Sequence, residues 1–257
     1  MQSLTKTQTH KIILILLLAG LSVQNNAKAR DSIHTLMQDQ IYEAYVYGKM
    51  PLWESTLASM ELEYMRNPSD ELLYDILLAQ YGLTGYYLGI DENASGRRLM
   101  EEAAPYLETL ESRLGFAAQA MLFKAAFYAF RIGMRPWLGV RLGPQSEKLI
   151  NDAISINPVY PRGWIEKGNM MYYAPAMFGG SKTKAIEHYV HAIELMEANM
   201  QNNHRWLYLS TLVSLAQAYD HLGNSGLAIA TLEKSLRFEP DFKWVKEELL
   251  PELKSKQ

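Results

Sequence analysis

From residue 30 to the C-terminus, apolar residues recur at spacings of three and four, which is the pattern of helices with one buried side. No run alternates with a period of two, and no Asn-Gly or Asp-Gly pair marks a hairpin between strands. The pattern predicts an all-α protein of about eleven helices, packed as stacked antiparallel hairpins in an α-α superhelix. Breaks rich in Gly, Pro and Asn are expected at 48–51, 67–69, 89–92, 114–115, 133–136, 157–161, 175–180, 201–204, 223–226 and 240–241.

The clearest repeating unit spans residues 209–240 and contains two helices joined near Gly223. Ala216 and Ala228 are small where the two helices are expected to cross, and Gly223 suits the left-handed end of a helix. Pro240 ends the second helix because proline cannot continue one. The unit resembles the tetratricopeptide repeat (TPR), a pattern of about 34 residues. The residues that carry the resemblance are Leu212, Ala216, Tyr219, Ala228, Leu232, Ser235 and Pro240.

A second copy begins near Pro161, and it contains an insertion. Trp164 on its first helix and Ala185 on its second are 21 residues apart, where the simple repeat allows about 16. The additional residues lie around Pro175–Gly180. The positions that match the repeat are Trp164, Gly168, Met171, Ala185, Tyr189 and Ala192.

The resemblance implies one helical repeat domain over residues 30–257, with an extended concave surface. Degenerate repeats are expected at 32–157, clearer repeats at 158–200 and 205–240, and a polar-faced capping helix at 242–256. The N-terminal half fits the pattern less well. Pro105 lies inside an expected second helix, and residues 131–144 look irregular.

The N-terminus has the features of an export signal. Lys6, His10 and Lys11 form a basic start, an apolar run follows at Ile12–Leu21, and Ala27-Lys28-Ala29 places small residues at a cleavage site. We therefore expect residues 1–29 to be a cleaved signal peptide; the alternative is an uncleaved anchor. No later segment has about 18 consecutive apolar residues, so we expect that the mature form does not span the membrane. Together with the export signal, this predicts an exported, periplasmic protein, with a secreted or envelope-associated protein as the alternative.

Composition narrows the function further. The net charge is −3 for the whole chain and −6 without residues 1–29, which disfavours nonspecific binding to nucleic acid. The absence of cysteine excludes disulfides, thiolate nucleophiles and Cys-ligated metals. No hydrolase, phosphate-loop or dinucleotide-binding motif is present either. We therefore expect a protein that is not an enzyme and has no catalytic residues, no cofactor and no metal.

Three local patterns each allow two interpretations. His188 and His191 have a spacing that can bind a metal, but a solvated helix face is favoured. Ser181 is suited to cap a helix after two glycines, and an anion at that helix start is the less favoured reading. Trp137 stands among Arg131, Arg135 and Arg141, where the favoured interpretation is a turn held by cation–π packing and the other a recognition patch.

In TPR proteins the first helix of each hairpin lines the concave face, and this implies which residues bind. The exposed residues expected there or beside the insertion are Arg162, Asn169, Tyr173, Phe178, Lys182, Gln217, Asp220 and His221. The predicted function is an exported scaffold that binds a protein or peptide partner in the cell envelope. The alternative is a periplasmic accessory or ligand-binding subunit of a small-molecule transport system, because residues 158–192 resemble helical subunits of some TRAP-type transporters.

Overall fold

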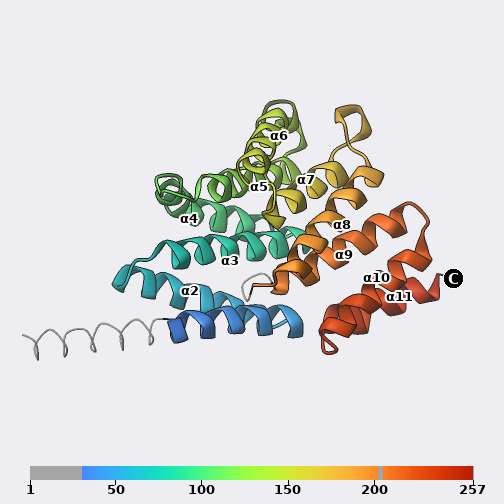
Figure 1. The fold of residues 1–257 in the computed structure, drawn as a ribbon, viewed down its shortest axis with the longest axis horizontal. Coiled ribbons are helices and arrows are strands. Elements are labelled where there is room, and N and C mark those ends of the chain that lie inside the picture. The colour runs from blue at the N-terminus through green and yellow to red at the C-terminus, as the bar shows by residue number, and fades with distance from the viewer. Residues whose placement is uncertain (1–30, 202–204, 257) are drawn as a thin grey trace, which may run out of the picture.

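The computed structural model describes residues 31–201 and 205–256. These residues contain helices and no strand, which confirms the predicted all-α class (Figure 1). None of their helices is both long and apolar enough to cross a membrane. The predicted signal peptide lies outside the described residues. The helices are a first helix at 31–47, α2 (Met50–Arg66), α3 (Asp70–Gly89), α4 (Asn93–Glu111), α5 (Ala117–Met134), α6 (Gly139–Ile156), α7 (Pro161–Tyr173), α8 (Lys182–Ala198), α9 (Arg205–His221), α10 (Ser225–Phe238) and α11 (Leu250–Ser255).

Successive helices pack as antiparallel hairpins, in the pairs α3 with α4, α5 with α6, α7 with α8, and α9 with α10. The turns fall at the predicted breaks for physical reasons that the sequence contains. Gly48, Gly115 and Gly223 each adopt positive φ, between 66° and 88°, where a side chain would be strained. Ser69 caps α3 by accepting a hydrogen bond from the amide of Leu72.

The expectation of irregular structure at residues 131–144 is wrong. Helix α5 continues to Met134, and a short 3-10 helix, η1 (Pro136–Leu138), leads directly into α6. Pro105 lies inside α4 without ending it. Proline removes one backbone donor and crowds the carbonyl four residues earlier, and the packing of α4 against α3 offsets this cost. At the C-terminus, a π-helical turn, η4 (Val245–Leu249), precedes α11.

The last complete repeat has the expected core. Leu212, Ala216, Ala228, Leu232 and Ser235 are each at most 1% exposed. Alanine at the crossing lets α9 and α10 approach closely, and their apolar faces are buried against each other. The residue assignments made from the repeat pattern in this unit are therefore confirmed.

The two ends of the array meet through aromatic side chains. We call Tyr45, Trp53, Trp206 and Phe242 the aromatic clasp. Trp53 of α2 and Trp206 of α9 have ring centroids 5.1 Å apart, and Tyr45 of the first helix lies 5.7 Å from Trp206 and 5.3 Å from Phe242. In Figure 1 the first helix accordingly runs toward α9 and α10 at the lower right. Aromatic pairs at these distances stabilise a fold beyond the area that they bury.

Polar contacts reinforce the closure. Tyr42 of the first helix donates a hydrogen bond to Glu239 at 2.9 Å, just after α10. Arg205 at the start of α9 pairs with Asp39 and lies 4.0 Å from the centre of the Tyr42 ring. The two polar pairs join residues 197 and 166 positions apart in the sequence. The N-terminal helix is therefore part of the same packed unit as the last repeat.

Because the two ends of the array meet, the helices that were predicted to line a concave surface pack against one another instead. One continuous core includes Leu77 of α3, Phe123 of α5, Ile165 of α7 and Leu212 of α9, all at most 3% exposed. The inner faces of these first helices therefore pack against one another and are filled by side chains. The open groove expected from an extended array is not available where these residues lie.

Two glycines on α3 test the clasp. A Cβ on Gly82 would lie 2.6 Å from Cζ2 of Trp53 and 2.8 Å from Cη2 of Trp206, whereas the nearest atom to a Cβ on Gly85 is 3.7 Å away. We expect Gly82→Ala to lower the free energy of unfolding by about 1–3 kcal/mol, because neither ring can move without disturbing the core. Gly85→Ala, the matched control, should raise it by about 0.5–1 kcal/mol through helix propensity. Urea denaturation of both variants measures the difference, and equal effects would contradict this packing.

Candidate functional site

The insertion between α7 and α8 forms a short, well-defined loop that includes a 3-10 helix, η2 (Ala176–Phe178). Gly179 has φ +87°, and a Cβ on Gly180 would lie 1.8 Å from the carbonyl oxygen of Ala174, so both positions require glycine. The backbone amide of Ser181 donates a hydrogen bond to the carbonyl of Met171 at 2.8 Å. The side chain of Ser181 caps α8 by accepting a hydrogen bond from the amide of Lys184. The backbone of the loop is thus fixed although its side chains are not buried.

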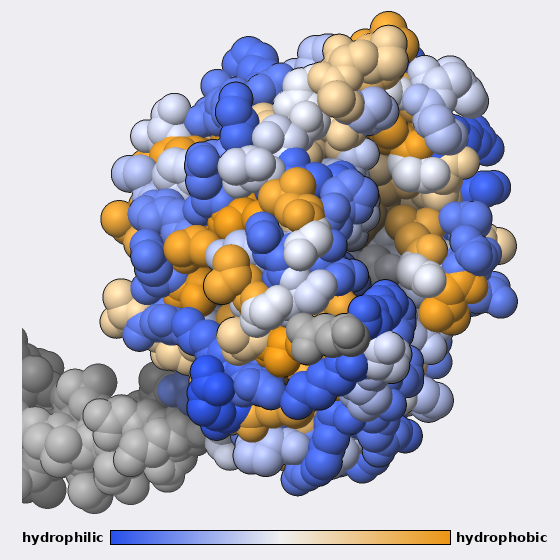
Figure 2. All heavy atoms as spheres, turned by 90° about the vertical axis from the view of Figure 1, so that its right-hand side faces the viewer, coloured by the Kyte–Doolittle hydropathy of each residue, from blue (hydrophilic) through white to orange (hydrophobic). Residues whose placement is uncertain are grey.

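The loop presents apolar side chains to solvent. Met177 is 83% exposed, Tyr173 is 72% exposed and Phe178 is 61% exposed. Figure 1 places this loop at the upper right of the array, and Figure 2, which views that side, shows hydrophobic patches interrupted by polar residues. Large apolar residues held in the open by a rigid backbone are typical of a contact surface.

Tyr172 connects the loop to the neighbouring repeat. Its ring lies 4.9 Å from the ring of Tyr173 and 6.3 Å from that of His221 at the end of α9. The ammonium of Lys182 lies 4.1 Å from the centre of the Tyr172 ring and donates a hydrogen bond to the Tyr172 carbonyl. Burial and the nearby Asp220 carboxylate raise the pKa of the Tyr172 phenol. We call Tyr172, Tyr173, Met177, Phe178, Lys182 and His221 the α7–α8 tip.

The structure brings half of the eight predicted binding residues together at this tip. Tyr173, Phe178, Lys182 and His221 belong to it, and Asp220 lies beside it, 4.0 Å from the ammonium of Lys256. Gln217 lies one turn earlier on α9 and is half-buried. Tyr172 and Met177 were not predicted as binding residues. The signal for them was present in the unusually apolar run from Tyr172 to Phe178.

Two predicted binding residues are not exposed. Arg162 is fully buried, with its guanidinium 3.7 Å from the centre of the Phe123 ring and 4.6 Å from that of Tyr81. Asn169 is half-buried and accepts a hydrogen bond from Tyr189 at 2.8 Å. The prediction that both are exposed is wrong, because the inner faces of α3, α5 and α7 converge instead of lining an open groove.

Arg162 is paired with Glu166 one turn later on α7, with Nη2 3.4 Å from Oε1. Burial raises the pKa of the Glu166 carboxyl, and the Arg162 charge opposes that rise. Glu166 also accepts a hydrogen bond from Asn169 at 3.3 Å. Nε and Nη1 of Arg162 have no hydrogen-bond acceptor among the described residues and lie against aromatic rings. This arrangement holds α7 against α3 and α5 and leaves no surface for a partner.

The two histidines of α8 pack against tryptophan. The rings of His188 and His191 lie 5.7 Å and 4.7 Å from that of Trp164 on α7. Burial lowers the pKa of His188. Across the part of the chain that the structure describes, no group of three or more His, Cys, Asp or Glu side chains is arranged to hold a metal ion.

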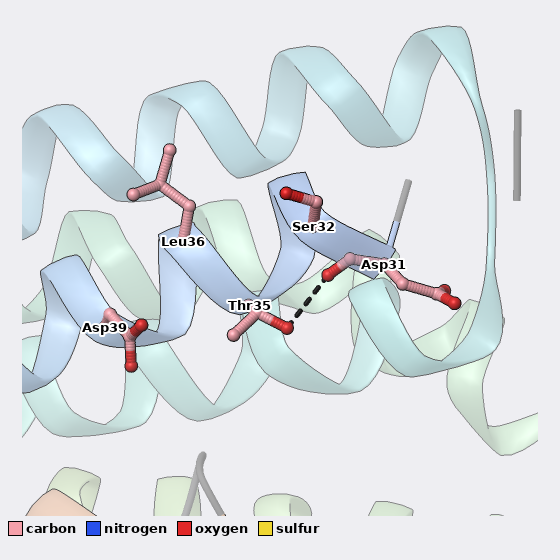
Figure 3. A pocket seen from close by; sticks show the side chains of 5 residues that line it. All are labelled: Asp31, Ser32, Thr35, Leu36 and Asp39. Atoms are coloured by element: carbon pink, nitrogen blue, oxygen red, sulfur yellow. Dashed lines mark hydrogen bonds between the residues drawn. The ribbon is translucent and has the colours of Figure 1, made fainter. Parts of the chain in front are cut away.

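A shallow depression lies beside the first described helix and is lined by Asp31, Ser32, Thr35, Leu36 and Asp39. All five come from one helix, and Figure 3 shows their side chains pointing to different sides of it. The hydroxyl of Thr35 donates to the backbone carbonyl of Asp31 at 2.8 Å. The side chains do not converge on a common point, so we do not assign a binding site here.

Comparison with known proteins supports the repeat assignment. The tetratricopeptide-repeat family model matches residues 209–242. Among solved structures, the HusA haemophore from Porphyromonas gingivalis is similar with a TM-score of 0.57 and 19% identity, over 66% of this chain and 84% of that one. A thermophilic TPR protein in Thermus thermophilus is similar with a TM-score of 0.54 and 19% identity, over 86% of this chain and 96% of that one. No curated protein matches the sequence.

The structural role of Arg162 can be tested by substitution. Arg162→Met leaves Glu166 buried without its partner, so we expect the free energy of unfolding to fall by about 3–5 kcal/mol. Replacing both residues, as Arg162→Met with Glu166→Met, should recover much of this loss. Arg97→Met, at an exposed position of α4, should change stability by less than about 0.5 kcal/mol. Thermal and urea denaturation measure all three; an Arg162→Met variant as stable as the parent would show that Arg162 is not a structural residue.

Proposed function

We propose, from the premise that this chain is a tetratricopeptide-repeat-like protein, that it is a non-catalytic scaffold and binds a protein or peptide partner through the α7–α8 tip. TPR proteins are typically scaffolds, and the described residues offer exposed apolar side chains at this tip rather than an open inner groove. The single observation that carries the proposal is that Met177 and Phe178 are 83% and 61% exposed on a loop whose backbone is fixed.

The chemistry of the tip suits a polypeptide partner. Tyr172 and Tyr173 offer flat rings with hydroxyl groups, which contribute area and hydrogen bonds with little loss of side-chain entropy. Lys182 adds a positive charge next to the rings, suited to a carboxylate on the partner. The loop does not need to order on binding, because glycines and backbone hydrogen bonds already hold it.

The proposed location is the cell envelope, with an exported, periplasmic mature form. This part of the proposal rests on the basic start, the apolar run and the small residues at Ala27-Lys28-Ala29. A partner in the same compartment follows from it. Mass spectrometry of the N-terminus of the protein recovered from the envelope fraction tests the cleavage site.

A second candidate function is binding of a small molecule for transport, the alternative raised by residues 158–192. One structural neighbour is described as a haemophore, and aromatic rings beside a lysine at the α7–α8 tip could stack on a porphyrin and pair with a carboxylate. Titration with haem, followed by its visible absorbance, tests this candidate. Saturable binding that is lost in Tyr172→Ala with Lys182→Ala would favour it over the scaffold.

Photo-crosslinking in cells tests the scaffold directly. With p-benzoylphenylalanine in place of Met177, we expect one specific protein adduct, because this side chain is at the centre of the proposed contact. The same residue in place of Leu114, which is 100% exposed at the α4–α5 turn, is the matched control and should give no such adduct.

Two substitutions then measure the contribution of the tip. Tyr173→Ser with Phe178→Ser should weaken binding of the purified partner about tenfold or more, as expected for aromatic anchors. Calorimetric titration gives the affinity, and circular dichroism confirms that the variant is folded. Equal adducts from positions 114 and 177, or unchanged affinity in the folded double variant, would refute the proposal.

A further inference from the structure

The turn between α5 and α6 concentrates positive charge in an otherwise acidic chain. Residues 112–146 contain five basic residues and no acidic one, although the whole chain has a net charge of −3. Arg113 pairs with Asp70 and Lys124 pairs with Glu111. Arg131, Arg135 and Arg141 are exposed, and none of them forms an ion pair with a described residue. The unpaired charge therefore gathers at one end of one hairpin.

The same turn exposes two large apolar side chains. Trp137 is 72% exposed and Val140 is 73% exposed. Trp137 makes no ring or cation–π contact with any described residue, so the expected cation–π packing with the arginines does not occur. A tryptophan that is 72% exposed contributes little to the stability of the fold, and this points to a role in contact with another surface.

The position of Arg141 is also unfavourable within the protein itself. It is the third residue of α6, close to the positive end of the helix dipole. A cation there raises the local potential instead of neutralising it. Together with Arg131 and Arg135 it makes the turn a focus of positive potential, and an anion bound there would pair with the guanidinium groups.

We propose that the α5–α6 turn, defined by Arg131, Arg135, Trp137, Val140 and Arg141, binds the surface of an anionic lipid bilayer. The guanidinium groups pair with lipid phosphates, and Trp137 and Val140 enter the interfacial region. Guanidinium groups beside an exposed tryptophan match a surface that carries phosphates above an interfacial region, which favours a lipid bilayer over an acidic protein.

The α5–α6 turn and the α7–α8 tip are separate sites that share no residue. The two sites lie at the turns inside successive hairpins, and such turns fall at the same edge of a stacked array because every hairpin starts in the same direction. Binding of the α5–α6 turn to a bilayer would orient that edge toward the membrane. A partner held by the tip would then lie close to the lipid surface.

Co-sedimentation with vesicles tests the proposal on the full chain. The probes are vesicles of phosphatidylcholine alone and with roughly 30 mol% phosphatidylglycerol. We expect binding to the anionic vesicles only, and replacement of Arg131, Arg135 and Arg141 by Gln should lower the partition coefficient about tenfold or more. About 0.5 M salt should weaken binding of the parent protein in the same way.

A matched control variant distinguishes the effect of charge at the α5–α6 turn from the effect of the net charge of the protein. Replacing Lys148, Lys243 and Lys246 by Gln removes the same charge from exposed positions elsewhere and should leave vesicle binding unchanged. Any contribution of residues 1–29 is the same in every variant. Binding that is equal for both triple variants, or equal on neutral and anionic vesicles, would overturn the proposal.

Trp137 supplies an independent readout. Brominated lipids quench tryptophan that enters the interfacial region, so Trp137→Phe should remove most of the quenching seen with anionic vesicles. Trp53 and Trp206 are buried, and Trp164 and Trp244 lie outside the α5–α6 turn, so these four should add little to the quenching if the turn is the part that meets the lipid. Quenching that persists in Trp137→Phe would show that another part of the chain meets the lipid. An acidic protein that binds the turn while vesicles do not would also refute the lipid assignment.

Discussion

The structure depends on the contact of Trp53 and Trp206 with Gly82. At this position α3 has no side chain, and the two indole rings from opposite ends of the chain occupy the space. Tyr45 and Phe242 extend the contact to the first helix and the C-terminal segment. A repeat array normally stabilises each hairpin only through its neighbours. Here a long-range contact joins the first and last units, so the described hairpins share one core.

This closure decides where function can reside. The inner faces of the first helices, which in an open array would line a groove, are filled by side chains such as Leu77, Phe123 and Ile165. Exposed apolar groups occur instead at the turns, where Tyr173, Met177 and Phe178 stand at one hairpin and Trp137 at the preceding one. Both proposals therefore concern the edge of the array and not its interior.

Two sets of arginines show how context changes the role of one residue type. Arg162 is fully buried between aromatic rings with Glu166 as its charge partner, and it contributes to packing. Arg131, Arg135 and Arg141 are exposed without ion pairs among the described residues. In the sequence all four appear as cations near aromatic residues. Only their surroundings separate a structural arginine from one that can bind an anion.

The sequence by itself determined the helices, their turns and the repeat at residues 209–240, because helix periodicity, glycine and proline act over a few residues. It also indicated the α7–α8 insertion, since Tyr172 to Phe178 is too apolar for an ordinary turn. The tertiary structure alone decided that Arg162 is buried, that Asn169 is half-buried and that Tyr172 meets His221. Those facts depend on how far the array curves. That curvature is set by contacts such as Trp53 with Trp206, which join residues far apart in the chain and leave no local pattern.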